Sequence, residues 1–404
     1  LSSFDTSNAI SMCQMFSGCS LLSSINLTSF DTKNVTDMNL MFSSTAISEL
    51  DISNFDTSKV TNMYMMFSKC NLLEKIYVNK NIFKTSEVTN IGRMFYDCKL
   101  LNTFKDKDNS LTNFDLSYFD TKNVTKMDGM FYNDQSIKSL DLSSFDTSNV
   151  VDMSNMFYNC KTLEELNISN FNTSLVTDMN NMFANCKAIS FVDLSGFDTT
   201  KVTNMKRMFY ASSFKTLDLR AFKTFDVADM NEMFTWCSSL ESLIIDNGFN
   251  KLIGDDILKD SKKLKIINLS NDTENLINIS GDVNINSKII LYVINKEMEE
   301  AYENDETFKT LFINADTSFE DISGDLGRIR TIMSLSGDSK VTIKENDSYV
   351  DDGAILFDEF IQKSGESNDL TTNFANIAGL KLSYSSNVDS STITSGDNYY
   401  KVSY

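Results

Sequence analysis

Residues 140–157 read Leu-Asp-Leu-Ser-Ser-Phe-Asp-Thr-Ser-Asn-Val-Val-Asp-Met-Ser-Asn-Met-Phe, and variants of this string recur along most of the chain. Phe-Asp-Thr or a close variant recurs at spacings of 25 to 28 residues, with one spacing of 36, and a Met-Phe pair follows each copy in step. A period of this length predicts a solenoid, in which similar units stack side by side. The nine copies begin at Phe4, Phe30, Phe55, Phe83, Phe119, Phe145, Phe171, Phe197 and Phe222.

One unit divides into a strand, a polar turn and a return segment. Residues 163–168 follow the pattern L-x-x-L-x-L, and their alternation predicts a short strand with Leu166 and Ile168 inward. Residues 176–183 have apolar side chains at i, i+3 and i+4, which predicts one or two helical turns with Thr177 as the N-cap. This return would place three apolar side chains in the core: Met179, Met182 and Phe183.

A unit of this size has one apolar face that it cannot bury alone. Stacked units would align their strands in a parallel sheet and merge their apolar faces into one core. The sequence therefore predicts an α/β solenoid, a leucine-rich-repeat stack of short parallel strands and short helical returns.

The string at 140–157 resembles the BspA-type leucine-rich repeat of bacterial surface proteins, a family that also occurs among mycoplasma lipoproteins. The resemblance covers residues 1–245. It implies a secreted or surface-anchored protein that uses its repeats for adhesion to host proteins, other cells or matrix.

The remainder of the chain departs from the repeat. Residues 246–330 carry a fading version of it, and residues 290–294 and 299–302 are similar to the closing strand and helix of this family. Such a cap is needed because an open end exposes both core and strand edge. Residues 331–404 resemble an all-β bacterial immunoglobulin-like module, and we expect it to be incomplete because it lacks room for a full set of strands.

The composition narrows the function. The net charge is −20, from 56 acidic and 36 basic residues, which disfavours nucleic acid as a partner. The chain has no His, so Ser-His and Cys-His catalysis are excluded, and no glycine-rich phosphate loop is present. We therefore expect no enzymatic activity, no cofactor and no bound metal. No apolar run is long enough to span a membrane, so this chain should not insert into one.

The chain starts inside a unit, since residues 1–6 match residues 142–147. No signal peptide or anchor is present, and we expect further sequence upstream. Given the family resemblance, the expected location is extracellular, at the cell surface.

Candidate binding residues follow from the strand pattern. Outward positions of successive strands should form a ladder with rungs about 5 Å apart, and several rungs carry acidic side chains. Two interpretations stay open: an acidic face that captures a basic partner or cation, or repeat-consensus residues that are solvated or bonded to a neighbouring turn. The candidate residues are Asp51, Tyr77, Asp115, Asp141, Asn167, Phe191, Asp193 and Asp218.

Six cysteines occur three residues after the phenylalanine of a Met-Phe pair, where other units have Thr45, Asp134 and Ser212. This shared position predicts a buried packing slot, because free Cys behaves as a small apolar residue. Disulfides between neighbouring units remain an alternative, as in Cys70 with Cys98 and Cys160 with Cys186. The six are Cys19, Cys70, Cys98, Cys160, Cys186 and Cys237.

Two further features have structural and functional interpretations. The Asp of Phe-Asp-Thr, as in Asp146, is expected to form a local turn rather than to bind an ion. The long unit between Phe83 and Phe119 contains Asp106, Asp108 and Ser110 at calcium-loop spacing, but it lacks the Gly and Glu of a true calcium loop. As an insertion in a solenoid, this segment is a candidate contact loop.

The function expected from the sequence is a cell-surface binding or adhesion module, monomeric, whose repeat surface contacts extracellular or host proteins. The alternative is a structural spacer or stalk that displays another domain and has no ligand of its own.

Overall fold

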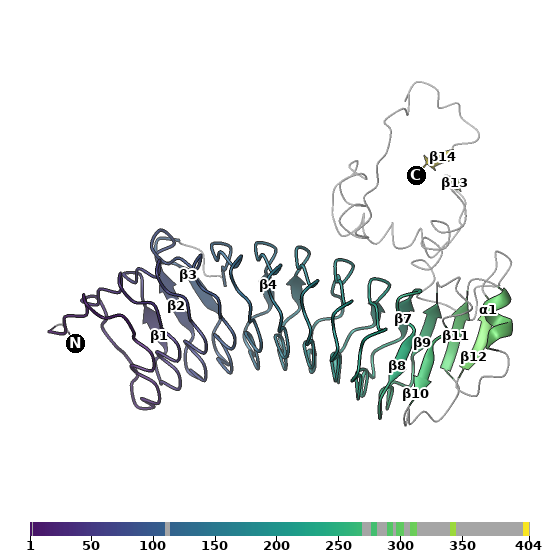
Figure 1. Ribbon diagram of the computed structural model, residues 1–404, viewed down its shortest axis with the longest axis horizontal. Coiled ribbons are helices and arrows are strands. Elements are labelled where there is room, and N and C mark those ends of the chain that lie inside the picture. Colours follow the sequence, from purple (N-terminus) through teal and green to yellow (C-terminus); the bar gives the residue numbers. More distant parts are fainter. Residues whose placement is uncertain are drawn as a thin grey trace, which may run out of the picture. The chain divides into compact units, whose positions relative to one another are not determined.

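The structure, a computed structural model, describes residues 1, 3–109, 114–268, 276–280, 289–293, 296–302, 308–312, 340–344 and 399–403. Two compact units are present: one comprises Leu1–Val293 with Glu297–Leu311, and the other Ile294–Lys296 with Phe312–Tyr404. The first unit is a stack of turns that lie side by side along its long axis (Figure 1).

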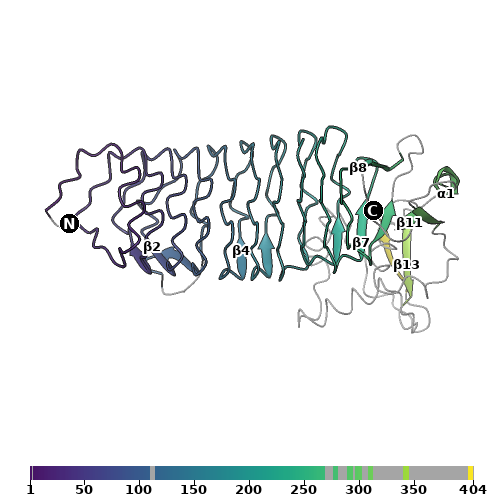
Figure 2. The same cartoon turned by 90° about the horizontal axis from the view of Figure 1, so that it is seen from below.

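Short parallel strands run along one edge of the first unit, where β2 and β4 lie in Figure 2. Their sheets have the orders β1-β2-β3, β4-β5 and β12-β11-β9-β7-β6. Each parallel partner comes from the neighbouring turn, as in Leu140 with Leu166. The parallel strands are β1 Glu49–Asp51, β2 Lys75–Val78, β3 Thr103–Asp106, β4 Ser139–Asp141, β5 Glu165–Asn167, β6 Thr216–Asp218, β7 Ser242–Ile245, β9 Lys265–Asn268 and β11 Ile289–Val293. Strand β12, Phe308–Phe312, lies next to β11 at the edge of its sheet.

The turns are numbered 1 to 9 by their Met-Phe pairs, from Met15-Phe16 to Met233-Phe234. The eight residues from four before the methionine to three after it are called the return, for example 152–159 in turn 6. Eight parallel bridges from Ser11 to Asp229 join the nine returns. The first unit is therefore a parallel β-solenoid, as expected for a leucine-rich-repeat stack.

The returns are not helical, and the prediction of helical turns was wrong. In turn 7, residues 178–185 form a bridge followed by consecutive tight turns. Asn181 and Asn185 have φ angles of 53° and 60°, which no right-handed helix allows. Thr177 is also not an N-cap, because its hydroxyl donates to the carbonyl of Val151 in the preceding turn. The expected burial was correct, since Met179, Met182 and Phe183 are all fully buried.

The backbone N–H groups of the return alternate between two kinds of partner. In turn 7 the N–H groups of Met179, Asn181 and Phe183 donate to carbonyls of turn 8, at 2.9–3.0 Å. The N–H groups between them bond locally, for example Met182 to the carbonyl of Met179 at 3.2 Å. The left-handed residues mark this alternation: the N–H of Asn181 itself donates to the neighbouring turn, whereas the N–H of the next residue, Met182, bonds locally. Each return is thus hydrogen-bonded to the next turn as a strand would be.

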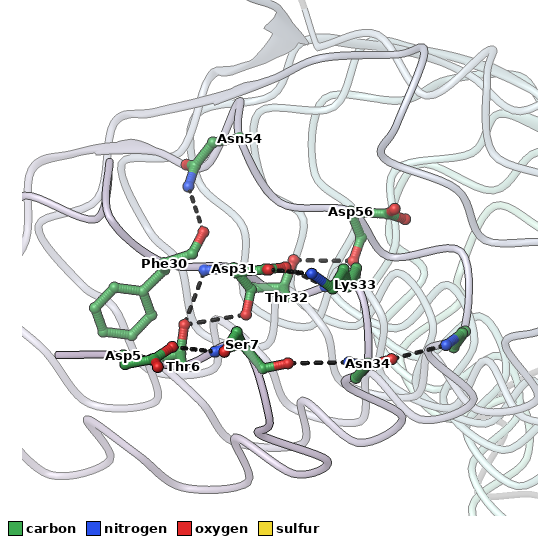
Figure 3. Close-up of polar contacts among 11 residues, drawn as sticks. Asp5, Thr6, Ser7, Phe30, Asp31, Thr32, Lys33, Asn34, Asn54 and Asp56 are labelled. Atoms are coloured by element: carbon green, nitrogen blue, oxygen red, sulfur yellow. Dashed lines mark hydrogen bonds and ion pairs between the residues drawn. The ribbon is translucent and has the colours of Figure 1, made fainter.

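A buried threonine ladder joins the turns at the corner between strand and return (Figure 3). The Thr6 hydroxyl donates to the carbonyl of Asp31 at 3.0 Å and accepts from the N–H of the same residue at 2.8 Å. Thr147 repeats this arrangement with Asn172 at 2.9 and 2.7 Å. The Thr of Phe-Asp-Thr therefore satisfies two backbone groups of the following turn.

The core consists of the Met and Phe side chains of successive turns. The Phe131 ring stacks on Phe157 at 5.8 Å, and Phe157 stacks on Phe183 at 5.6 Å, with interplanar angles of 1° and 12°. Each of these rings is at most 1% exposed. The repeated Met-Phe pair thus forms continuous rows inside the stack.

The long unit adds a rung on the strand side alone. Asn90 bridges directly to Lys126 on the return side. On the strand side, Ile76 pairs with Phe104, and Phe104 bridges in turn to Phe114. The described part of the inserted segment therefore does not simply protrude, because Phe104 is fully buried. The extra rung lengthens the strand side by about 4.8 Å relative to the return side at this point.

The stack continues beyond the last Met-Phe pair. Ile257 and Leu258 are buried in place of Met and Phe and form a turn 10 that the sequence pattern missed. Strand β8 (Lys251–Ile253) pairs with β10 (Asn278–Ser280). A strand and a short helix occur where the closing segment was expected, β11 and α1 (Lys296–Ala301), with Met298 buried. Strand β12 extends the sheet beyond β11, and closure of the stack by this segment stays a prediction.

The second unit contains one described antiparallel pair, β13 (Lys340–Lys344) with β14 (Tyr399–Ser403). Most of the expected immunoglobulin-like module, including residues 349–354 and 380–384, lies outside the described residues.

Replacing Thr147 by Val should lower the free energy of unfolding by about 1–3 kcal/mol, because the N–H and C=O of Asn172 would lose their partner, the fully buried Thr147 hydroxyl. Thr147→Ser keeps the hydroxyl and should cost about 1 kcal/mol. Urea unfolding followed by circular dichroism measures both. Equal losses for Val and Ser would contradict the hydrogen-bonding role.

Lys69 is exposed and has a φ of 59°, so its backbone is strained relative to glycine. Lys69→Gly should raise the free energy of unfolding by about 0.5–1 kcal/mol, and Lys69→Val should lower it by more than about 1 kcal/mol. Lys59→Gly is the matched control at an exposed lysine without positive φ, and it should destabilise. The opposite order for the two Lys69 variants would refute the left-handed return.

Candidate functional site

The predicted binding residues lie along the strand edge of the stack. In β1, β4 and β5 the side chains alternate outward, inward, outward, and Asp51 is aligned with Tyr77 and Asp141 with Asn167. Asp51, Asp141, Asn167 and Phe191 are exposed. The others are partly exposed: Tyr77, Asp115, Asp193 and Asp218.

The extra rung changes which residues are neighbours in this row. Tyr77 is aligned with Lys105 of β3, not with Asp115. The Lys105 ammonium lies 5.9 Å from the centre of the Tyr77 ring, a cation–π distance. The sequence pattern had placed an acidic residue there because it counted one strand per Met-Phe pair.

Most acidic and amide residues of the row form local turns. The Asp141 Oδ1 accepts from the N–H of Ser143 at 2.9 Å, and Asp193 and Asn167 bond in the same way to the residue two positions later. This Asx turn ends the strand and explains why Asp and Asn alternate at this position. The Asp of Phe-Asp-Thr is likewise a turn former, as predicted: the Asp146 Oδ1 accepts from the N–H of Ser148 at 3.0 Å.

Basic residues neutralise the N-terminal part of the row. The Asp51 Oδ2 lies 2.7 Å from the Lys107 ammonium, and Glu49 lies 2.5 Å from that of Lys75. Partial burial opposes ionisation of Asp51, but hydrogen bonds from Lys107 and Ser53 outweigh it and hold its pKa below the usual value.

The middle of the row is different. Within the part of the chain that the structure describes, Asp115, Asp141 and Asp193 form no ion pair. Phe191, two residues before Asp193, is 50% exposed. At the far end, Asp218 pairs with Arg220 at 2.6 Å. An acidic stretch with an exposed aromatic ring therefore lies between two neutralised ends.

The cysteine row is a packing slot, as predicted, and it has a hydrogen-bonding role that the sequence did not reveal. All seven cysteines are free, and those at positions 70, 98, 160, 186 and 237 are buried. The Cys98 thiol donates to the carbonyl of Phe67 at 2.9 Å, and the Cys160 thiol donates to that of Phe131 at 3.1 Å. Cys19 is the exception, because it is exposed in turn 1.

Asp134 occupies the same slot, at 2% exposure. Its Oδ1 accepts from the N–H groups of Ser136 and Ile137 at 2.9 and 2.8 Å, and its Oδ2 is buried without a partner. Burial raises the pKa of Asp134 to about 7, despite these two hydrogen bonds. A carboxyl group in a slot for neutral side chains therefore favours its protonated form.

An aromatic row on the return side was missed entirely. Tyr132 stacks on Tyr96 at 4.3 Å and on Tyr158 at 4.6 Å, and Arg93 lies over Tyr96 at 5.9 Å. A second group, Arg207, Tyr210 and Trp236, lies further along the same side. The signal was available, because each of these tyrosines directly follows a Met-Phe pair.

No cluster of three or more Cys, Asp or Glu side chains suited to a metal ion occurs among the residues described. The candidate calcium ligands are not shown to lie together. Asp106 is buried with the Lys80 ammonium 3.7 Å away, and Ser110 lies outside the described residues. No helix in the described ranges has the length and apolar character to cross a membrane.

The parallel strands, Met-Phe core and inter-turn ladders define a leucine-rich-repeat solenoid. The family model described as "Mycoplasma protein of unknown function, DUF285" matches residues 1–107, 81–189 and 130–247, and the chain belongs to this family. The model "BspA type Leucine rich repeat region (6 copies)" matches residues 230–314. The resemblance to BspA-type repeats is thereby confirmed, whereas the immunoglobulin-like resemblance stays a prediction.

Among solved structures, a leucine-rich repeat protein from Bacteroides ovatus is similar to this chain. It is 15% identical, with 66% of this chain and 84% of that chain covered, and the TM-score is 0.23. No curated protein matches the chain.

Asp134 should make the free energy of unfolding depend on pH. A carboxyl whose pKa is about 7 when folded and near 4 when unfolded stabilises the fold below pH 4, and this contribution is lost as the pH rises to 7. The loss is on the order of 4 kcal/mol. Asp134→Asn keeps the Oδ1 acceptor, so it should be more stable than the wild type at pH 8 and not at pH 4.

Urea unfolding at the two pH values measures this difference. Asp146→Asn is the control, because hydrogen bonds to Ser148 lower the pKa of Asp146 and give the opposite sign. A wild type and Asp134→Asn variant with the same pH dependence would contradict the account.

Proposed function

We propose that the chain is a binding module displayed at the cell surface, whose repeats contact extracellular or host proteins without catalysis or a cofactor. Its strand edge would hold the partner through Asp115, Asp141, Asn167, Phe191 and Asp193. The observation that supports this most is the stretch of carboxylates without ion pairs beside the exposed Phe191 ring.

Electrostatics favour a basic partner. Adjacent rungs lie about 5 Å apart, so carboxylates on one face repel one another unless a cation or basic group approaches. A partner rich in Lys or Arg would relieve this repulsion, and the net charge of −20 would attract it from a distance. The exposed Phe191 would supply apolar contact at one end of such an interface, beside Asp193.

The family supports the same proposal in outline. BspA-type repeats are associated with surface proteins, and an extended stack offers a long, continuous contact surface. Adhesion as the purpose of the contact is the further step of the proposal.

A protein array of purified extracellular-matrix and serum proteins, probed with the full chain, tests the proposal. The triple variant Asp115→Asn, Asp141→Asn, Asp193→Asn should weaken binding at least about tenfold at about 0.1 M salt, and the wild type should lose affinity as salt increases. Because Asn167 already forms the same turn, these variants should fold normally.

The matched control makes the same charge change at the corner, with Asp56→Asn, Asp146→Asn and Asp198→Asn, where Asn172 occurs naturally. This control should bind as the wild type does. If both triple variants lose the same affinity, the loss comes from the change in net charge and not from the strand edge. No binding to any protein on the array would favour the spacer alternative.

A further inference from the structure

The return face consists of the outward side chains of the returns in turns 3 to 10. Its tyrosines are held rigidly, since Tyr132 lies between Tyr96 and Tyr158 with interplanar angles of 13° and 11°. Arg93 is fixed between the Tyr96 ring and Asp128, at 2.9 Å from the carboxylate. Arg207 is fixed in the same way by Tyr210 and Glu232.

This composition is that of an interaction surface. Tyr, Trp and Arg are the residue types that contribute most to protein interfaces, and Asn supplies adaptable hydrogen bonds. Trp236, the single tryptophan of the chain, is 50% exposed on this face. Since stacking already restricts the tyrosine side chains, they would lose little conformational entropy on binding.

We propose that two copies of this chain pair through their return faces, with the stacks antiparallel, so that turn n lies opposite turn 13 − n of the partner copy. A twofold axis parallel to the return segments produces this arrangement. It places equivalent positions of two different turns opposite each other, so each contact occurs twice. The sequence analysis expected a monomer, whereas this proposal makes the chain a homodimer.

Charges are complementary in this register. Arg93 of turn 4 and Glu232 of turn 9 each precede the methionine by one residue, so they face each other. Asp128 of turn 5, which is 8% exposed and already bonded to Arg93, lies opposite Lys206 of turn 8, since both precede the methionine by two residues. Lys69 of turn 3 likewise faces Asp260 of turn 10, and both are exposed.

Uncharged side chains that lie opposite each other in this register are also compatible. Asn155 faces Asn181 and Asn159 faces Asn185, which pairs carboxamides that can donate and accept at once. Tyr158 lies opposite Ala184, whose side chain is fully buried beneath the face. One pair is unfavourable, Asp152 opposite Asp178 at the start of the returns, and both of these side chains accept hydrogen bonds from their own turns.

One neighbouring register is worse. A shift that places turn 4 opposite turn 8 brings Arg93 against Arg207, two like charges. In the proposed register Asp128 gains a second cation. Burial and Asp152 raise the pKa of Asp128 although Arg93 is bonded to it, so an additional positive charge would stabilise its ionised form.

The return face is large enough for a stable interface between two copies. Eight turns about 4.8 Å apart cover roughly 34 Å, and a return of eight residues with tight turns is on the order of 20 Å wide. The product is about 700 Å² per copy, close to the roughly 800 Å² of a standard interface.

A charge reversal in trans tests the proposal on the full chain by sedimentation velocity. The wild type should sediment at twice the chain mass of 45.6 kDa at about 50 µM. Arg93→Glu and Glu232→Arg should each weaken pairing at least about tenfold, and the double variant should restore it. Turns 4 and 9 of one chain are about 24 Å apart, so only contact between two chains can produce the rescue.

Glu165→Arg, an exposed charge reversal on the strand edge, is the control and should leave pairing unchanged. Circular dichroism confirms that each variant is folded. A wild type that sediments as a monomer at this concentration, a pair that survives both single reversals, or a double variant without rescue would each overturn the proposal. Binding of the wild type on the protein array is a separate measurement, so failure of pairing and failure of the proposed function can be told apart.

Discussion

The stack depends on the hydrogen bonds that each return makes with the following turn. Every second N–H of a return points at a neighbouring carbonyl, as Phe183 does toward Met208 at 2.9 Å. A turn without its neighbour would leave these groups unpaired, at roughly 1–3 kcal/mol for each buried group. The turn is therefore not an independent folding unit, and the stability of the fold resides in the contacts between turns.

The same constraint determines the sequence pattern that is repeated from unit to unit. The corner threonine bonds to the backbone of the next turn, and the cysteine slot bonds to the backbone of the preceding one. Both positions need a small side chain with a donor, which explains why Thr, Ser and Cys occur in them. Asp134 is an outlier because a carboxylate cannot donate, and it fits the slot when protonated.

The sequence predicted the features that depend on side-chain periodicity. The turn length, the buried Met-Phe rows and the short strands follow directly from repeated apolar positions, and the Asp turns follow from a local Asx preference. The return conformation was wrong because apolar residues at i, i+3 and i+4 suit both a helix and a chain of tight turns. What decides between them is the left-handed φ at residues such as Asn181, and Leu40 and Met65 also adopt it, so composition gives little warning.

The candidate site was predictable only in part. Alternation placed the strand-edge residues correctly on the surface, but the extra rung that puts Lys105 beside Tyr77 depends on how the inserted residues pair. The Lys107–Asp51 pair joins residues far apart in the sequence, which no repeat pattern reveals. The return face was overlooked because the helical interpretation drew attention to its buried side.

Both proposed surfaces exist only if successive turns lie side by side around one core. Selenium positions from selenomethionine-labelled crystals test this most directly. The account predicts that Met153, Met179, Met205 and Met230, all fully buried, give a row of selenium sites about 5 Å apart. Selenium sites that are scattered, or that lie at the protein surface, would contradict it.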